Sequence, residues 1–254
     1  MSKPWVLVTG AGSGIGQGIS EVLASKGFPV LVTDLNGEAA AAVAEGIVAK
    51  GGKAESGTLN VGDAAAIDAF VSRLNLPVGA VVNNAGLQHV AKLEEFPPER
   101  WALLIQVMLT GAAMLTRALL PGMRERGYGR VINIGSIHSL VGSPYKSAYV
   151  AAKHGLLGFS KVMALETADT DITVNTICPS YVKTPLVDKQ IEAQAKENGI
   201  SPEEVVSEIM LKPMPKGVFI SLEELAGITE FLMSDSARNI TGQAITVDGG
   251  WTVR

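Results

Sequence analysis

Residues 9–16 read Thr-Gly-Ala-Gly-Ser-Gly-Ile-Gly, and this glycine-rich stretch decides the fold. An apolar, strand-like run at residues 5–9 leads into it, and a helical pattern follows it. Glycines let a ligand approach the backbone closely, and the N-terminus of a following helix presents free N–H groups to a pyrophosphate. The strand–loop–helix order therefore predicts a dinucleotide site, with the cofactor held by Gly10, Ser13, Gly14, Ile15 and Gly16.

A carboxylate ends the second strand-like run. Asp34 stands 18 residues after Gly16, where its oxygens can accept hydrogen bonds from the adenosine ribose and repel a 2′-phosphate. No lysine or arginine occupies the glycine loop or directly follows Asp34. These features favour NAD over NADP. Asp34 can also initiate the turn before Asn36 and Gly37, and this structural role is compatible with the functional one.

Apolar strand-like runs alternate with amphipathic helical stretches along the whole chain. This order predicts an α/β fold with a doubly wound parallel sheet, and continuous rather than alternating apolar strands indicate that helices cover both faces. Two helical stretches, 98–126 and 147–168, are longer and more apolar than a helix with one solvated face requires. Residues 186–219 mix charged and apolar residues and predict a helical lid over the site. The predicted strands are 5–9, 29–34, 53–60, 80–83, 130–135, 173–178 and 244–247.

Composition limits the classes of function. With 254 residues and 47% hydrophobic content, residues 1–254 fit a single domain with one core. The net charge of -4 without a basic cluster argues against nucleic acid or an anionic membrane as partner. The N-terminus carries no signal-type apolar stretch and the single cysteine, Cys178, cannot form an internal disulfide, so a cytoplasmic protein is expected. We expect a small-molecule partner and no metal site.

Ser136, Tyr149 and Lys153 form a second informative set. Tyr149 and Lys153 stand four residues apart in a helical run, so their side chains leave the same face. A tyrosine with a pKa of about 10 needs cationic neighbours to exchange protons near neutrality. Ser136 follows a strand, at the sheet edge where it can donate a hydrogen bond to a carbonyl oxygen. A Tyr-x-x-x-Lys pair alone is most often a solvated helix face, but beside a nucleotide site the three residues predict proton transfer in a redox reaction.

These motifs, together with Asn83-Asn84-Ala85-Gly86, resemble the short-chain dehydrogenase/reductase family from about Val6 to Val253. The resemblance implies a Rossmann-type three-layer αβα sandwich with a seven-stranded parallel sheet, hydride transfer with a secondary alcohol, and a homotetramer assembled through the two long helices. It also implies roles in the NAD site: for Asn60 and Val61 beside the adenine, for Asn83, Ala85 and Gly86 beside the nicotinamide, for Lys153 and Tyr149 beside its ribose, and for Pro179, Val182 and Thr184 around the carboxamide.

The segments around the triad resemble the D-3-hydroxybutyrate dehydrogenase branch of that family, an assignment that implies NAD-dependent oxidation of this acid to acetoacetate in ketone body metabolism. A lysine with several neutral or protonated donors is what a small carboxylate needs, because each hydrogen bond to a charged group contributes about 1.5–3 kcal/mol. Another hydroxy acid, a sugar or a polyol is the alternative substrate, and a non-catalytic NAD-binding protein is the more distant alternative. The expected substrate residues beside Ser136 and Tyr149 are Gln88, His138, Lys146, Gln190, Tyr181 and Trp251.

Two positions depart from the family pattern. Met108 stands where the family carries an asparagine that helps hold a distortion of the long helix, and its thioether cannot make that side-chain hydrogen bond. We expect the distortion to persist, because its carbonyl groups belong to the backbone. Ser180 and Tyr181 stand where the branch has glycine and tryptophan, and a smaller aromatic side chain can enlarge the pocket.

Overall fold

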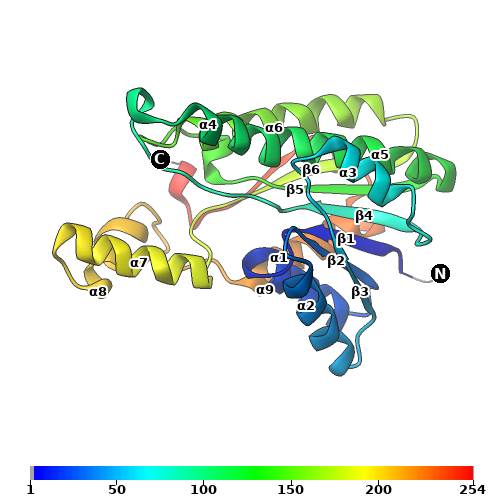
Figure 1. The fold of residues 1–254 in the computed structure, drawn as a ribbon, viewed down its shortest axis with the longest axis horizontal. Coiled ribbons are helices and arrows are strands. Elements are labelled where there is room, and N and C mark those ends of the chain that lie inside the picture. The colour runs from blue at the N-terminus through cyan, green and yellow to red at the C-terminus, as the bar shows by residue number, and fades with distance from the viewer. Residues whose placement is uncertain (1–2, 254) are drawn as a thin grey trace.

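The protein, described here by a computed structural model for residues 3–253, is built on one seven-stranded sheet. All strands run parallel in the order β3-β2-β1-β4-β5-β6-β7, so the chain winds outward from β1 in both directions. The predicted three-layer sandwich is confirmed (Figure 1). The strands are β1 Trp5–Thr9, β2 Val30–Asp34, β3 Ala54–Thr58, β4 Val78–Asn83, β5 Tyr128–Ile134, β6 Asp171–Pro179 and β7 Ala244–Val247.

Helices cover both faces of the sheet. In Figure 1, α1, α2 and α9 lie below the sheet, whereas α4, α5 and α6 lie above it. The α-helices are α1 Gly14–Ser25, α2 Gly37–Ala49, α3 Ala64–Val71, α4 Pro98–Ile105, α5 Gly111–Arg126, α6 Ser147–Glu166, α7 Pro185–Asn198, α8 Pro202–Glu204 and α9 Leu222–Met233. The shorter turns are η1 Leu93–Glu95, η2 Gln106–Thr110, η3 Ile137–Ser139, η4 Val205–Met210, η5 Asp235–Ala237 and η6 Trp251–Val253.

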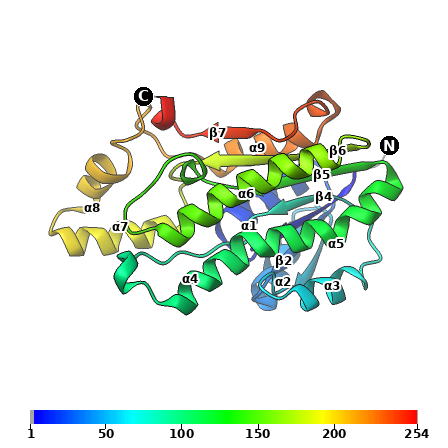
Figure 2. The same ribbon diagram turned by 90° about the horizontal axis from the view of Figure 1, so that it is seen from above.

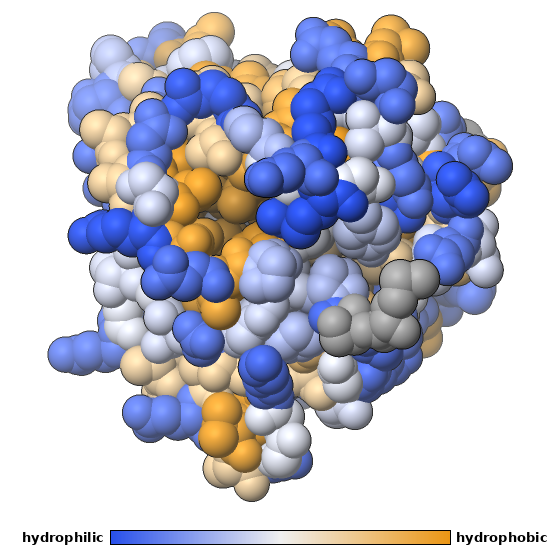
Figure 3. Space-filling model, turned by 90° about the vertical axis from the view of Figure 1, so that its right-hand side faces the viewer, coloured by the Kyte–Doolittle hydropathy of each residue, from blue (hydrophilic) through white to orange (hydrophobic). Residues whose placement is uncertain are grey.

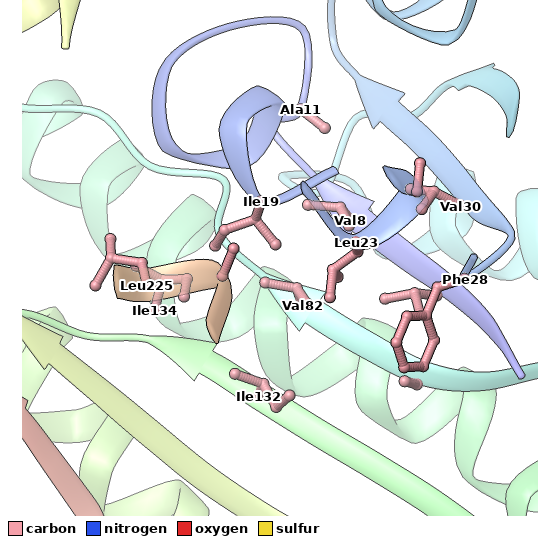
Figure 4. Close-up of a cluster of buried hydrophobic side chains, with 14 of the residues drawn as sticks. Val8, Ala11, Ile19, Leu23, Phe28, Val30, Val82, Ile132, Ile134 and Leu225 are labelled. Carbon is pink, nitrogen blue, oxygen red and sulfur yellow. The ribbon is translucent and has the colours of Figure 1, made fainter. Parts of the chain in front are cut away.

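The alternation of side chains along β1 divides the core into two layers. Val6 and Val8 point into the apolar layer between the sheet and helices α1, α2 and α9. Trp5 and Leu7 point into the layer between the sheet and helices α3 and α5. Figure 4 shows the first layer, in which Val8 lies among side chains from α1 and the neighbouring strands. Because both layers are apolar, β1 has no polar face, and this explains its uninterrupted apolar sequence.

The long helix predicted for residues 98–126 is continuous but not uniform. It comprises α4, one π-helical turn at η2, and α5. The expected distortion is therefore present around Met108. Among residues 3–253 this is the one helical segment long and apolar enough to cross a membrane by length and composition alone. In this fold it lies beside α6, as Figure 2 shows, and it buries Leu104, Met108 and Leu115.

The carboxyl ends of the strands lie at one end of the molecule. Figures 1 and 2 both place α7 and α8 and the C-terminus at this end and the N-terminus at the other. The predicted lid region is helical, with α7, α8 and η4 packed around their own small apolar cluster, which includes Val187, Ile191 and Val205. The opposite end, seen in Figure 3, mixes hydrophilic residues with separate apolar patches.

Candidate active site

The glycine loop between β1 and α1 has the conformation that a close backbone approach requires. Gly10 and Gly14 have φ values of +60° and +59°, in the left-handed region that favours glycine. A Cβ at Gly16 would lie 2.5 Å from both Asn84 Nδ2 and the carbonyl oxygen of Gly10. A Cβ at Gly14 would meet open space. The loop is thus packed against Asn84 at Gly16, whereas it is open at Gly14, where α1 begins.

Asn84, which directly follows β4, holds the loop in place. Its Nδ2 donates hydrogen bonds to the carbonyl oxygens of Thr9 and Gly10, at 2.9 and 3.0 Å. The Thr9 hydroxyl in turn accepts hydrogen bonds from the backbone N–H groups of Asn84 and Ala85, both at 3.0 Å. Asn84 therefore ties β4 to the end of β1. This role of Asn84 was not predicted from the sequence, although the residue belongs to the Asn-Asn-Ala-Gly motif.

Asp34 lies at the carboxyl end of β2, as predicted, and its carboxylate faces the loop. One oxygen accepts a hydrogen bond from the backbone N–H of Gly12 at 2.9 Å, and the other accepts one from Asn36 at 2.9 Å. A Cβ at Gly12 would lie 3.0 Å from the carboxylate, so glycine is required at this close approach. Asp34 is half-buried and bears a negative charge where a ribose of a dinucleotide bound to the loop would lie.

The other predicted cofactor residues lie in segments that follow the strand ends. Asn60 is exposed and its side-chain oxygen accepts a hydrogen bond from Gly62, whereas Val61 is buried. Ala85 is half-buried and Gly86 exposed after β4. Pro179 ends β6, Val182 is buried and pairs with Ile220, and Thr184 caps α7 by accepting a hydrogen bond from Val187.

The side chain of Asn83 points into the interior of the protein. It is buried, and its Nδ2 donates to Asn133 Oδ1 at 2.8 Å and to Thr116 Oγ1 at 3.3 Å. Asn133 continues this network by donating to Ser160. The side chain of Asn83 therefore links β4 to β5 and α5 inside the protein, and the expected place of Asn83 beside a nicotinamide stays a prediction.

Ser136, Tyr149 and Lys153 come together as predicted. Ser136 follows β5 and caps η3, where its hydroxyl accepts a hydrogen bond from the backbone N–H of His138 at 3.1 Å. Tyr149 and Lys153 share one face of α6, with the Lys153 ammonium 5.6 Å from the centroid of the Tyr149 ring. Lys153 is buried and donates to the carbonyl oxygen of Ile134 at 2.6 Å. This bond anchors α6 to the end of β5.

Burial governs the protonation of this group. Burial lowers the pKa of Lys153 to about 8. Burial also raises the pKa of Tyr149, and a hydrogen bond with Ser136 lowers it only in part. We expected the Lys153 ammonium to lower the pKa of Tyr149. In this structure the influence that opposes burial is instead the hydrogen bond with Ser136.

A small cavity lies between the π-helical turn and Lys153. Its volume is about 10 Å³, the space for the centre of one water molecule. Lys153, Met108 and Asn83 are among its lining residues. The Oδ1 atom of Asn83 is buried and, within residues 3–253, has no hydrogen-bond partner. Met108 is 2% exposed and packs in an apolar cluster with Ala148 and Ala152 of α6.

Three of the six expected substrate residues form a row of rings that begins at Tyr149. The His138 ring makes edge contacts with Tyr149 and Trp251, at centroid distances of 6.2 and 6.3 Å, and Tyr181 lies 6.0 Å from Trp251. Burial, with a smaller contribution from the charge of Lys146, lowers the pKa of His138 to about 4. The imidazole is therefore neutral near pH 7, and its buried Nδ1 has no hydrogen-bond partner among residues 3–253.

Lys146 and the two glutamines are the remaining expected substrate residues. Lys146 directly precedes α6, is half-buried, and has a pKa lowered by burial. Its positive charge contributes to the lowered pKa of His138. Gln88 is exposed in the segment after β4, and Gln190 is half-buried on α7. The contacts of these glutamines with a substrate stay predictions.

Comparison with known proteins agrees with this geometry. The model of the short chain dehydrogenase family matches residues 4–195. D-beta-hydroxybutyrate dehydrogenase of Cupriavidus necator is 46% identical over 98% of this chain and 97% of its own length. The enzyme of the same name from Rhizobium meliloti is 42% identical over 98% of each chain. A crystal structure of a variant of actinorhodin polyketide ketoreductase with NADPH superposes with a TM-score of 0.92, at 33% identity over 98% of this chain and 97% of that one.

Proposed function

This chain belongs to the short-chain dehydrogenase family, and from that membership we propose that it catalyses the reversible NAD-dependent oxidation of D-3-hydroxybutyrate to acetoacetate. It is a secondary-alcohol dehydrogenase. The observation that supports this choice of substrate is the contact of His138, neutral near pH 7, with Tyr149, together with the influence of the Lys146 charge on His138. One small molecule can then present its hydroxyl to Tyr149 and its carboxylate to Lys146.

The residues of the glycine loop fit a dinucleotide. Gly14 leaves open space at the start of α1, and the free N–H groups of the first helical turn suit a pyrophosphate. Asp34 supports NAD, because its carboxylate accepts ribose hydroxyls but repels a 2′-phosphate. When bound, NAD supplies the acceptor for the hydride leaving C3 of the substrate.

The protein's own residues handle the proton and the orientation of the substrate. Tyr149 Oη takes the hydroxyl proton of the hydroxy acid, and Ser136 Oγ donates a hydrogen bond to the same substrate oxygen. The Lys153 ammonium stabilises the phenolate through the shared face of α6 and binds the nicotinamide ribose. These groups hold the reacting oxygen between two side chains fixed by β5 and α6, and this orientation is their contribution to the rate.

Recognition of the carboxylate falls to Lys146, with His138, Gln88 and Gln190 as hydrogen-bond donors. Lys146 is half-buried, and an ammonium removed from water attracts a carboxylate more strongly than an exposed one does. Trp251 and Tyr181 form the apolar wall that limits the length of the acid. We assign the excursion formed by α7, α8 and η4 as a lid that closes over this pocket.

We further propose a cytoplasmic homotetramer that assembles through the long helix and α6. The outer surface of these helices carries apolar side chains that the chain itself leaves exposed, among them Leu103, Val162 and Leu165. Leu165 is 79% exposed, so association would remove much apolar area from water. Association of this kind also accounts for the apolar composition of the long helix without a membrane.

The direct test is an assay of NADH absorbance with the purified protein, NAD and D-3-hydroxybutyrate. The matched controls are the L enantiomer and D-3-hydroxypentanoate. We expect strong turnover of the D four-carbon acid and little of its enantiomer. Weak turnover of all three acids by a protein that binds NAD would contradict the proposal and direct attention to sugars, polyols or other hydroxy acids.

A further inference from the structure

The chain ends in a turn that is organised by one buried carboxylate. Asp248 follows β7 and is 7% exposed. Its Oδ1 accepts a hydrogen bond from the backbone N–H of Gly250 at 2.9 Å. Its Oδ2 accepts one from the backbone N–H of Thr252 at 2.8 Å and one from the Thr252 hydroxyl at 2.6 Å. Three hydrogen bonds from a single side chain therefore fix the conformation of residues 248–252.

Two glycines let this turn lie against the return of the lid. Gly249 and Gly250 have φ values of +60° and +90°. A Cβ at Gly249 would lie 3.1 Å from the side chain of Met214, and the carbonyl oxygen of Gly249 accepts a hydrogen bond from Lys216 at 3.0 Å. Residues 214–216 lead from the lid helices back toward α9. The turn formed by residues 248–252 therefore packs against the segment that follows the lid helices.

The turn also sets the position of Trp251. The backbone N–H of Trp251 donates to the carbonyl oxygen of Asp248 at 3.2 Å. The indole stands between His138, at 6.3 Å, and Tyr181, at 6.0 Å. His138 in turn contacts Tyr149. A row of rings thus runs from Tyr149 through His138 and Trp251 to Tyr181, and Trp251 is held in this row by the turn that Asp248 organises.

We infer that Asp248 is a positioning residue of the substrate pocket: it folds the C-terminal turn so that Trp251 closes the pocket against His138 and Tyr181. The inference rests on the proposed function for the identity of the substrate but not for the geometry. Because indole position depends on the carboxylate, loss of Asp248 loosens the wall that excludes longer acids. The groups that transfer the hydride and the proton stay in place.

Kinetics of Asp248→Asn and Asp248→Ala separate this role from a general loss of structure. We expect KM for D-3-hydroxybutyrate to rise while KM for NAD stays unchanged. We also expect the preference for the four-carbon over the six-carbon D-3-hydroxy acid to fall about tenfold, the size of effect that small changes in an apolar pocket produce. Asp169→Asn is the matched control, since Asp169 also accepts hydrogen bonds, from Arg124 and Thr170, but lies at the opposite end of the molecule.

A spectroscopic readout makes the inference independent of the substrate. In protein labelled with 5-fluorotryptophan, the three tryptophans give three ¹⁹F resonances, and Trp251→Phe identifies that of Trp251. Asp248→Ala should move or broaden this resonance and leave those of Trp5 and Trp101 unchanged. If Asp248→Ala does not fold, Thr252→Val tests the same point, because it removes only the hydroxyl hydrogen bond.

An unmoved Trp251 resonance in these variants, or equal changes in the kinetics of both acids, would overturn the inference. Failure of the proposed function has a different signature. In that case D-3-hydroxybutyrate is not oxidised by the unmodified protein, while the ¹⁹F resonance of Trp251 still responds to the loss of Asp248.

Discussion

The buried ammonium of Lys153 donates a 2.6 Å hydrogen bond to the carbonyl oxygen of Ile134, at the last residue of β5. This contact fixes the charge of Lys153 at the end of β5, two residues before Ser136 in the chain. The bond that holds α6 against the sheet therefore requires an ammonium to be removed from water. The cost of that desolvation appears in the lowered pKa of Lys153.

The first prediction concerns stability and pH. The pKa of Lys153 falls from 10.5 to about 8 on folding. The unfolded chain therefore binds more protons between pH 8 and 10.5, and the folded state gains stability as the pH rises through that window. Relative to Lys153→Met, the free energy of unfolding of the unmodified protein should rise by about 3 kcal/mol from pH 8 to 10.5. Urea denaturation at several pH values measures this difference.

The control for this prediction is Lys161→Met, which removes an exposed lysine from the same helix. We expect its stability curve to run parallel to that of the unmodified protein. Parallel curves for Lys153→Met as well would show that folding does not perturb the Lys153 ammonium.

The second prediction concerns the choice of cofactor. Asp34→Asn keeps an oxygen near the N–H groups of Gly12 and Asn36 but removes the negative charge. We expect KM for NAD to rise about tenfold, in keeping with the loss of one hydrogen bond to a charged acceptor. We expect activity with NADP to increase, because a 2′-phosphate is no longer repelled. Steady-state kinetics with both cofactors test this, and an unmodified protein that prefers NADP would refute the role of Asp34.

The third prediction concerns recognition of the carboxylate. Lys146→Ala should raise KM for D-3-hydroxybutyrate at least about tenfold, the equivalent of one charge-assisted hydrogen bond. The matched neutral substrate is the methyl ester of the same acid, and its KM should change little. The KM of Lys146→Gln for D-3-hydroxybutyrate should lie between those of the unmodified protein and Lys146→Ala, because an amide keeps a donor without the charge. Equal effects on acid and ester would argue against carboxylate binding by Lys146.

The fourth prediction concerns Met108 in the π-helical turn η2. The turn is present without an asparagine, and Gln106 Nε2 helps hold it by donating to the carbonyl oxygen of Gly62 at 3.3 Å. Met108→Asn should therefore change kcat only modestly. The fully buried position also makes an amide costly there, so we expect some loss of thermal stability. A hundredfold gain in kcat would mean that the natural chain lacks a group it needs.

Much of the fold and of the reaction centre could be predicted from the sequence. All seven predicted strands agree with the observed ones to within a few residues. The five inner strands are recognisable as apolar runs because both faces of a parallel sheet are buried, whereas the edge strand β3 reads Ala-Glu-Ser-Gly-Thr and is largely exposed. Ser136, Tyr149 and Lys153 could be assigned because their spacing around a strand and a helix leaves few arrangements open. The position of Asp34 at the end of β2 was predicted in the same way, whereas its hydrogen bond with Gly12 was not.

The remaining features depend on contacts between distant segments. The inward orientation of Asn83 is set by Asn133, 50 residues away, and the clamp formed by Asn84 is set by Thr9, 75 residues away. The raised pKa of Tyr149 results from burial that no local pattern records. The turn at Asp248 looks like an ordinary glycine turn in the sequence, and only the fold places it beside His138.

The proposed function requires Tyr149 to accept the hydroxyl proton of D-3-hydroxybutyrate during its NAD-dependent oxidation. The most direct measurement is the turnover of Tyr149→Phe with saturating NAD, together with its affinity for NAD by fluorescence titration. We predict that turnover falls below a few per cent of the unmodified protein while NAD affinity changes little. Activity above that level with intact NAD binding would contradict this role of Tyr149, because another group would then be accepting the proton.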